Sequence, residues 1–313
     1  MARPAVTTPP AIYVSSSRYD LRQLTAALPA RPEVSIVCNE SGKRLSEDQL
    51  IATRPPNCVG IIAGLEPLSA RVLDHYVDLK VIARLGTGMD TVDLAAASRR
   101  GISVLGTPDA TTDAVAELTV GLMIAALRGV VVADRAMRNK DWSPVVGGLV
   151  KGRTVGIIGF GRIGRRVAEL VEAFGARVRF FDPMVHGSDP RQASMQDLLA
   201  TSDVVTLHAP LTDETRGLLG AHEISQLKEG CLVVNVARGG LLDEAALVSA
   251  VRAGRVRAAL DCFVDEPYVG ALSELPGVVL SAHMGSLTEE TRTLMEVTAA
   301  RQLVAELQKH GVL

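Results

Sequence analysis

Three side chains suited to alcohol chemistry follow short apolar segments in the second half of the sequence, namely Arg238, Glu266 and His283. Oxidation of an alcohol needs a base for the hydroxyl proton, and a neutral histidine is the side chain best suited to that task near pH 7. A carboxylate that is hydrogen-bonded to the other ring nitrogen would fix the tautomer of the imidazole. The planar guanidinium of Arg238 can bind a substrate carboxylate and polarise a neighbouring oxygen. Together, these residue types predict a proton-transfer site.

Each of these residues alone has an ordinary structural interpretation. A glutamate before a proline, like Glu266, is typical of a solvated turn, and an arginine like Arg238 is typical of a surface ion pair. A single histidine at the end of a strand is more often a hydrogen-bonded polar residue, because clustered rather than isolated titratable groups indicate a site. The interpretation as a site therefore depends on the domain in which the three residues occur.

That domain carries a glycine motif, Gly159-Phe160-Gly161-Arg162-Ile163-Gly164, between an apolar strand-like run and a segment with helical periodicity. A strand, a turn and a helix form the context that a dinucleotide-binding loop requires. The first glycine permits the tight turn, the second lets a pyrophosphate approach the backbone, and the third lets helix and strand pack closely. The N-terminus of the helix then offers N–H donors and a favourable dipole to phosphates. The motif predicts a dinucleotide site.

The choice between the two nicotinamide dinucleotides is indicated by Asp182, which follows the next strand-like run. A carboxylate at this position binds the ribose hydroxyls of NAD and would repel the 2′-phosphate of NADP. Residues 183–188 contain no arginine that could bind such a phosphate. The sequence therefore favours NAD as the cofactor.

Strand-like runs alternate with segments of helical periodicity in two series, which predicts two α/β units with parallel sheets. The first series has expected strands at 12–14, 34–38, 59–63, 79–83 and 102–105, and expected helices at 19–28, 46–52, 69–77 and 92–100. The second has expected strands at 154–158, 177–181, 203–207, 231–235, 258–261 and 278–281, and expected helices after residues 161 and 194, at 221–228 and at 243–253.

Three further segments connect or complete the two units. Residues 112–127 give an almost entirely apolar helix pattern, which is typical of a helix buried in a core or a subunit interface. Residues 129–151 are mixed in character and predict an extended surface loop. Residues 288–310 have helical periodicity, and Ser286 with Glu289 forms a candidate capping box. We expect this last helix to return to the first unit.

These patterns predict the division of the chain. Residues 1–105 and 287–313 are expected to form a discontinuous substrate-binding domain, and residues 106–286 a dinucleotide-binding domain. Both are predicted to be doubly wound parallel sheets of the Rossmann or flavodoxin-like kind. A second capping box is expected at Ser46 and Gln49, and Gly101 stands where a glycine commonly follows a helix.

Composition disfavours several classes of function. The formal net charge of -2 argues against non-specific binding to nucleic acid or a membrane surface, and no run approaches the length of a membrane-spanning segment. The four cysteines show no C-x-x-C pattern and no metal-ligand spacing, so we expect no metal site and a reducing compartment. The N-terminal residues lack an apolar leader segment, and we therefore expect a cytoplasmic protein.

The sequence resembles the D-isomer-specific 2-hydroxyacid dehydrogenase family, and within it the D-3-phosphoglycerate dehydrogenase branch. The likeness begins near residue 59 and covers nearly all of the chain from there. It rests on the glycine motif, on the segments that carry the three candidate side chains, and on the runs LKVIARLGTGMD (79–90), VAE (115–117) and VTLHAPLT (205–212).

The resemblance implies an activity and a set of site residues. The activity is NAD-dependent transfer of a hydride between C2 of a small D-2-hydroxy acid and nicotinamide, with His283 as acid and base, Glu266 tuning it and Arg238 binding the carboxylate. Implied cofactor contacts, besides those of the glycine motif, are Thr87, Arg162, Ile163, Asp182, His208, Ala237, Asp261 and Gly285. Implied substrate contacts are Arg84, Thr87 and Gly88, together with Arg238 and His283. A homodimer built around the helix at 113–128 is also implied.

Departures from the family pattern are few. Cys262 stands in place of a usual valine, Ala282 in place of a usual proline, and Leu118 where a histidine is common. None of them affects the three candidate side chains. Because the sequence ends at Leu313, we expect no regulation through the small-molecule-sensing domain that some phosphoglycerate dehydrogenases carry at this end.

Three alternatives stay open. They are D-3-phosphoglycerate dehydrogenase proper, a phosphite- or phosphonate-type dehydrogenase, and a non-enzymatic NAD-sensing protein similar to a corepressor of the same fold. The intact catalytic trio disfavours a sensor, and the absence of a lysine between Arg84 and Asp93 disfavours phosphite oxidation. The loop at 63–67 holds Glu66 and no cation, which disfavours a phosphorylated substrate, although Arg135 or Arg138 of a partner subunit could supply positive charge.

Overall fold

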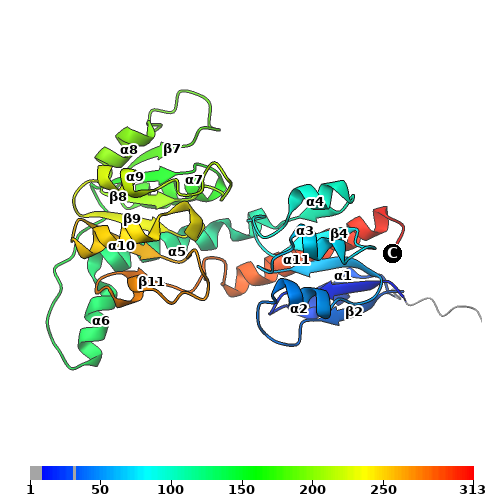
Figure 1. Ribbon diagram of the computed structural model, residues 1–313. Coiled ribbons are helices and arrows are strands. Elements are labelled where there is room, and N and C mark those ends of the chain that lie inside the picture. Colours follow the sequence, from blue (N-terminus) through cyan, green and yellow to red (C-terminus); the bar gives the residue numbers. More distant parts are fainter. Residues whose placement is uncertain (1–8, 31–32) are drawn as a thin grey trace, which may run out of the picture. The chain divides into compact units, whose positions relative to one another are not determined.

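The computed structural model describes residues 9–30 and 33–313 as two α/β units (Figure 1). Unit 1 comprises the described residues of Met1–Thr111 together with Thr288–Leu313, and unit 2 comprises Thr112–Leu287. Each unit has one sheet in which every strand pairs in parallel with its neighbours. The predicted fold class, α/β with two parallel-sheet domains, is confirmed.

Unit 1 has a five-stranded sheet in the order β2-β1-β3-β4-β5. Its strands are β1 (Ala11–Val14), β2 (Ser35–Cys38), β3 (Cys58–Ala63), β4 (Val81–Arg84) and β5 (Ser103–Leu105). Its helices are α1 (Leu21–Ala27), α2 (Glu47–Ala52), α3 (Ala70–Asp74), α4 (Leu94–Arg99) and the C-terminal α11 (Glu289–Lys309). Helix α11 packs on α1 and on β3, β4 and β5, where Leu303 and Leu307 are fully buried. The last helix is thus part of the core of unit 1.

The predicted helix caps of unit 1 are present, with one exception. The capping box of Ser46 and Gln49 is present at α2, and Gly101 has a φ of 67° after α4, as a glycine in that position requires. The predicted capping box at Ser286 is wrong, because Thr288 is the N-cap of α11. Its side chain accepts a hydrogen bond from the backbone N–H of Thr291, and Ser286 lies in the preceding turn.

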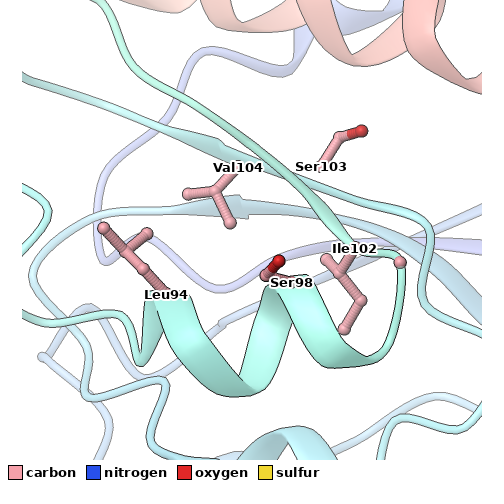
Figure 2. A pocket seen from close by; sticks show the side chains of 6 residues that line it. Leu94, Ser98, Ile102, Ser103 and Val104 are labelled. Carbon is pink, nitrogen blue, oxygen red and sulfur yellow. The ribbon is translucent and has the colours of Figure 1, made fainter.

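A hollow of about 420 Å³ lies between α4 and β5 of unit 1 (Figure 2). The side chains that line it are apolar or small, and they include Leu94, Ser98, Ile102 and Val104. The lining contains no charged side chain. The hollow therefore lacks the groups that would bind an anionic substrate.

Unit 2 has a six-stranded sheet in the order β11-β10-β9-β8-β6-β7. Its strands are β6 (Thr154–Ile158), β7 (Arg177–Phe181), β8 (Val204–Leu207), β9 (Cys231–Asn235), β10 (Val256–Leu260) and β11 (Val279–Leu280). Its helices are α7 (Arg162–Ala173), α8 (Met195–Thr201), α9 (Ala221–Gln226), α10 (Glu244–Arg252) and two short 3-10 helices, η1 (Gly239–Leu241) and η2 (Ala271–Glu274). β7 lies along one edge of β6, and the next strand in the sequence, β8, lies along its other edge. The strand order therefore reverses beside β6.

Helix α5 (Pro108–Arg128) begins in unit 1 and runs mainly in unit 2. Among the described residues it is the helix whose length and composition would permit it to cross a membrane. Its Ala116, Met123 and Leu127 are buried in one hydrophobic core with Val155 and Ile157 of β6. This packing accounts for the apolar character of the helix without a membrane.

The prediction of an extended loop over residues 129–151 is partly wrong. Residues Val130–Arg138 form a helix, α6, and an irregular segment follows it (Figure 1). The helix begins after Gly129, which has a φ of 64°, and its last turn has an ion pair of 2.8 Å between Arg138 and Asp134. The loop was expected because the segment is mixed in character, and its three consecutive valines have low helix propensity. No residue of α6 is buried.

Candidate active site

The glycine motif forms the turn between β6 and α7. Gly159 has a φ of 92°, and a Cβ placed there would lie 2.5 Å from the backbone nitrogen of Ala209. A Cβ on Gly164 would lie 2.2 Å from the carbonyl oxygen of Gly159, so side chains are excluded at both positions. A Cβ on Gly161, by contrast, would meet no described atom within 4 Å. Gly161 is the N-cap of the twelve-residue α7, and the turn therefore offers helix N–H donors beside open space.

Asp182 follows β7 and lies against this turn. Its Oδ2 accepts a hydrogen bond of 2.7 Å from the backbone N–H of Phe160, and its Oδ1 accepts one of 2.9 Å from the N–H of Met184. The carboxylate is only partly buried, so lone pairs are left for further donors. The predicted ribose-binding carboxylate is thus beside the predicted phosphate-binding turn, and Arg162 and Ile163 begin the helix that follows.

Two arginines near this turn were missed by the sequence reasoning. The guanidinium of Arg165 lies 4.8 Å and that of Arg191 lies 5.3 Å from the centre of the Phe160 ring, which stacks on Phe180. Arg191 is paired with Asp189 at 2.8 Å and with Glu172 at 3.2 Å. Its positive charge is therefore balanced by the protein's own carboxylates.

His208 follows β8, which pairs with β6 on the side opposite to β7. Its backbone N–H donates to the carbonyl of Ile158 at 2.7 Å, and its Nε2 is 2.9 Å from the hydroxyl of Thr206. Among the described residues, its Nδ1 is buried and has no hydrogen-bond partner. Burial lowers the pKa of His208 to about 3, so the ring is neutral at physiological pH. A buried polar atom without a partner is expected where another molecule supplies one.

Arg238 lies three residues after β9, in a loop whose backbone is hydrogen-bonded to the side chain of Asn235. The side-chain amide of Asn235 donates to the carbonyl of Arg238 at 2.8 Å, and its oxygen accepts from the N–H of Ala237 at 3.0 Å. A Cβ on Gly239 would lie 1.9 Å from the carbonyl carbon of Phe263, so this loop is in close contact with the loop after β10. The loop contacts bring the segments that carry Arg238 and Glu266 together.

Glu266 and His283 form a hydrogen-bonded pair across the loops that follow β10 and β11. The two carboxylate oxygens of Glu266 lie 2.9 and 2.8 Å from Nδ1 of His283. The backbone N–H of Phe263 donates to Glu266 at 3.1 Å and steadies the carboxylate. The side chains of Glu266 and His283 are 21% and 24% exposed. Because Nδ1 faces the carboxylate, Nε2 is the ring nitrogen that remains for proton exchange.

Asp261, directly after β10, holds the loop that carries the histidine. Its Oδ1 accepts hydrogen bonds from the N–H of Met284 at 2.9 Å and from the hydroxyl of Ser281 at 2.6 Å. Its Oδ2 accepts one from the N–H of Gly285 at 2.9 Å, and its backbone carbonyl accepts one from the N–H of His283 at 2.8 Å. The residue is fully buried. This positioning contact was not foreseen in the sequence, which gave Asp261 only an implied cofactor contact.

The other predicted site residues lie in unit 1. Arg84 ends β4 and is buried, and its Nη1 donates to the carbonyl of Leu85. The hydroxyl of Thr87 lies 2.7 Å from that of Thr111, and Gly88 follows Thr87 in the same turn. Arg84, Thr87 and Gly88 end or follow β4, at the edge of the unit 1 sheet formed by the carboxyl ends of its strands.

Glu66, also in unit 1, is 2% exposed, and its carboxylate accepts a hydrogen bond of 2.6 Å from the N–H of Gly64. Burial raises the pKa of Glu66, while the positive charges of Arg84 and Arg44 act in the opposite direction. The carboxyl group is thus not a solvated surface acid. It is a buried group in electrostatic contact with the arginine predicted to bind the substrate.

The residues of unit 2 fit a dinucleotide. The open space at Gly161, the partly exposed carboxylate of Asp182 and the buried Nδ1 of His208 are separate observations that agree with such a ligand. The glycine turn, His208, Arg238, Glu266 and His283 all follow parallel strands of one sheet, so they lie at the same edge. Ligands bind at this edge in sheets of this kind, beside the strand at which the order reverses.

Residues 120–285 match the family described as D-isomer specific 2-hydroxyacid dehydrogenase, NAD binding domain. The chain belongs to this family. The match covers just over half of the chain and includes the glycine turn, Asp182 and the three candidate catalytic residues Arg238, Glu266 and His283. The resemblance inferred from the sequence motifs is therefore confirmed, and unit 2 contains the family's NAD-binding domain.

Several known proteins are similar to the chain over most of its length. A hydroxypyruvate reductase of Thermotoga maritima is 34% identical, over 85% of this chain and 90% of the relative. A D-3-phosphoglycerate dehydrogenase of Mycobacterium bovis is 40% identical, over 78% of this chain and 48% of the relative. The chain thus spans about half the length of the phosphoglycerate dehydrogenases that it matches. The TT0316 protein of Thermus thermophilus has a crystal structure that superposes with a TM-score of 0.86 at 35% identity, over 96% of this chain and 97% of that chain.

Proposed function

We propose that this member of the family is an NAD-dependent oxidoreductase that acts at C2 of a small D-2-hydroxy acid, or on the 2-oxo acid in the reverse direction. The observation that carries the proposal is the hydrogen-bonded pair of Glu266 and His283 in the unit that holds the dinucleotide turn. A sensor protein of the same fold would not need this pair. Turnover of a 2-hydroxy acid with NAD, followed by absorbance of the reduced nicotinamide, tests the proposal directly.

The proposed mechanism assigns one task to each side chain. Bound NAD supplies the hydride acceptor. Glu266 keeps the proton of the neutral imidazole on Nδ1 of His283, so Nε2 presents a lone pair that takes the proton of the C2 hydroxyl. In the reverse direction the same atom returns the proton to the C2 oxygen. Arg238 binds the substrate carboxylate and polarises the C2 oxygen.

Cofactor binding is assigned to the residues of the glycine turn and its surroundings. The N–H groups at the start of α7 would bind the pyrophosphate, and Asp182 would accept hydrogen bonds from the adenosine ribose. His208 and Ala237 lie at the ends of neighbouring strands and are assigned to the remaining contacts. Asp261 and Gly285 contribute through the loop that presents His283, which their hydrogen bond holds in place. Thr87 of unit 1 is proposed as a further contact.

We propose that Arg84, Thr87 and Gly88 bind the substrate, and that the substrate carries no phosphate. A phosphate dianion is normally bound by several donors or paired cations. The buried carboxyl group of Glu66 interacts electrostatically with Arg84, and residues 63–67 add no cation beside it. A small monoanionic acid, of the kind named for the hydroxypyruvate reductase relative, needs no cation beyond Arg84 and Arg238 and suits this arrangement.

We expect 3-phosphoglycerate not to be the best substrate. The measurement is kcat/KM for 3-phosphoglycerate, D-glycerate, D-lactate and a hydroxyphosphonate, for the wild type and for Arg84→Ala and Glu66→Gln. Glu66→Gln should raise the relative use of 3-phosphoglycerate, since it removes a carboxylate from the vicinity of Arg84. If the wild type prefers 3-phosphoglycerate by about tenfold or more, a cation elsewhere binds the phosphate and the chain is a phosphoglycerate dehydrogenase.

We propose that the protein is cytoplasmic. We also propose that two copies of the chain form a homodimer through the helix at 113–128 and the adjoining segment 130–149. The supporting observation is a series of exposed apolar side chains in that segment. Met137 is 52%, Trp142 83% and Val146 98% exposed. A monomer rarely leaves so many large apolar groups in water, whereas a symmetric dimer covers the same patch on both copies.

The substitution Val146→Asp, combined with Met137→Asp, is expected to convert the dimer to a monomer, because two unpaired carboxylates would be buried in the interface. Sedimentation velocity measures the change. Val77→Asp is the matched control, since Val77 is 74% exposed in unit 1 and lies outside the proposed interface. A wild-type chain that sediments as a monomer at micromolar concentration would contradict the proposal.

A further inference from the structure

Cys262 lies beside the proposed catalytic pair. The Sγ atom of Cys262, a carboxylate oxygen of Glu266 and a ring nitrogen of His283 all lie within 4.8 Å of one another. Cys262 is 1% exposed, while Glu266 and His283 are partly exposed. The sequence gave no sign of this cluster, since the spacing between the cysteine and the histidine matches no common metal motif. The three ligand atoms meet only because the loops after β10 and β11 pack together.

The chemistry of this cluster suits a borderline-soft divalent ion. Zn²⁺ binds thiolate, imidazole and carboxylate ligands in tetrahedral sites, and three protein ligands leave the fourth position for water. A hard ion such as Mg²⁺ would prefer oxygen ligands alone. The partial exposure of Glu266 and His283 gives an ion access to the cluster, and the thiol of Cys262 is buried. From this geometry we propose that Cys262, Glu266 and His283 form a Zn²⁺ site.

Occupation of the site has a defined consequence for the imidazole. The ring nitrogen that faces Glu266 is Nδ1, so the ion takes the place of the proton that lies between them. Binding releases the thiol proton of Cys262 to solvent and moves the ring proton to Nε2, so charge and protons balance. With both nitrogens engaged, the ring has no lone pair for a substrate proton. Zn²⁺ is therefore a reversible inhibitor. This inhibition rests on the proposed function, whereas the binding of Zn²⁺ to the three side chains does not.

Cobalt binding tests the site without any assay of activity. Addition of Co²⁺ to the wild-type chain is expected to give a thiolate-to-metal absorption band in the near ultraviolet at one ion per chain, and Zn²⁺ should abolish it. Cys262→Val should lose the band, and Cys231→Val, which alters another buried cysteine of unit 2, should keep it. Cys262→Ser replaces the valine variant if that does not fold. No band in the wild type, or an undiminished band in Cys262→Val, overturns the site.

Turnover measurements then test the inhibition. The Zn²⁺ concentration that halves activity should be higher in Cys262→Val than in the wild type by at least about 10- to 100-fold, the usual cost of losing an outer-shell partner alone. A chelator should restore wild-type activity. Equal inhibition of both proteins overturns this part of the proposal. If the metal-free wild type turns over none of the hydroxy acids while the cobalt band is present, the proposed function fails and the metal site stands.

Discussion

Replacing His283 by alanine is expected to lower kcat by roughly 10²–10⁴-fold, the usual contribution of general acid–base catalysis. The variant loses the Nε2 lone pair that takes the hydroxyl proton. NAD binding should be retained, because the turn that we propose to bind the phosphates lies after β6, whereas His283 lies in the loop after β11. The measurements are steady-state turnover and calorimetric titration with NAD.

Two further variants make this experiment specific. Glu266→Gln should lower kcat less than His283→Ala, since an amide oxygen can still accept a hydrogen bond from Nδ1 but carries no charge. His222→Ala is the matched control, because His222 is an exposed residue of α9 whose ring bonds to Gln226. A His283→Ala enzyme that keeps more than a tenth of kcat would show that another group accepts the proton.

Replacing Asp182 by alanine is expected to raise the KM for NAD by about 10- to 100-fold, since hydrogen bonds to a charged acceptor contribute roughly 1.5–3 kcal/mol. The same change should narrow the preference for NAD over NADP, because the repulsion of the 2′-phosphate is removed. Values of kcat/KM with both dinucleotides measure the two effects.

The ratio of the two kcat/KM values is the decisive quantity. Asp182 also accepts a hydrogen bond from the N–H of Phe160, so its loss loosens the glycine turn for either dinucleotide, and the ratio cancels this common effect. Asp213→Ala, which removes an exposed carboxylate of unit 2, controls for the change in net charge. A wild-type enzyme that prefers NADP would refute the assignment and point to Arg165 or Arg191 beside Phe160.

The elements that could be predicted from the sequence are those governed by local patterns. β6, β7 and β9 begin and end at the predicted residues. β6 and β9 are short, mainly apolar runs, and β7 alternates charged and apolar residues before two phenylalanines, so each has a local strand pattern. The glycine turn could be predicted for the same reason, since its three glycines and the flanking strand and helix are contiguous. α6 could not be, because its valines oppose the helix and the local signal favoured a loop.

The parts of the site that could not be predicted depend on contacts between distant residues. The hydrogen bonds that the carboxylate of Asp261 accepts from the N–H groups of Met284 and Gly285 join positions more than twenty residues apart. The burial of Glu66 and the position of Arg191 near Phe160 likewise depend on how loops fold over the sheets. A search limited to residues 183–188 could not reveal that Arg191, farther along the chain, lies near the glycine turn.

The backbone at His283 has a φ of 49°, in a region that side chains with a Cβ rarely adopt. Such a conformation costs about 1–3 kcal/mol, and it persists because the N–H groups of His283 and Met284 both donate hydrogen bonds to Asp261. Glycine would adopt the same conformation without this cost. Selection for thermal resistance alone would therefore favour losing the imidazole, and selection for turnover would oppose that loss. A collection of stabilised variants obtained without an activity screen should be enriched in inactive proteins through this single position.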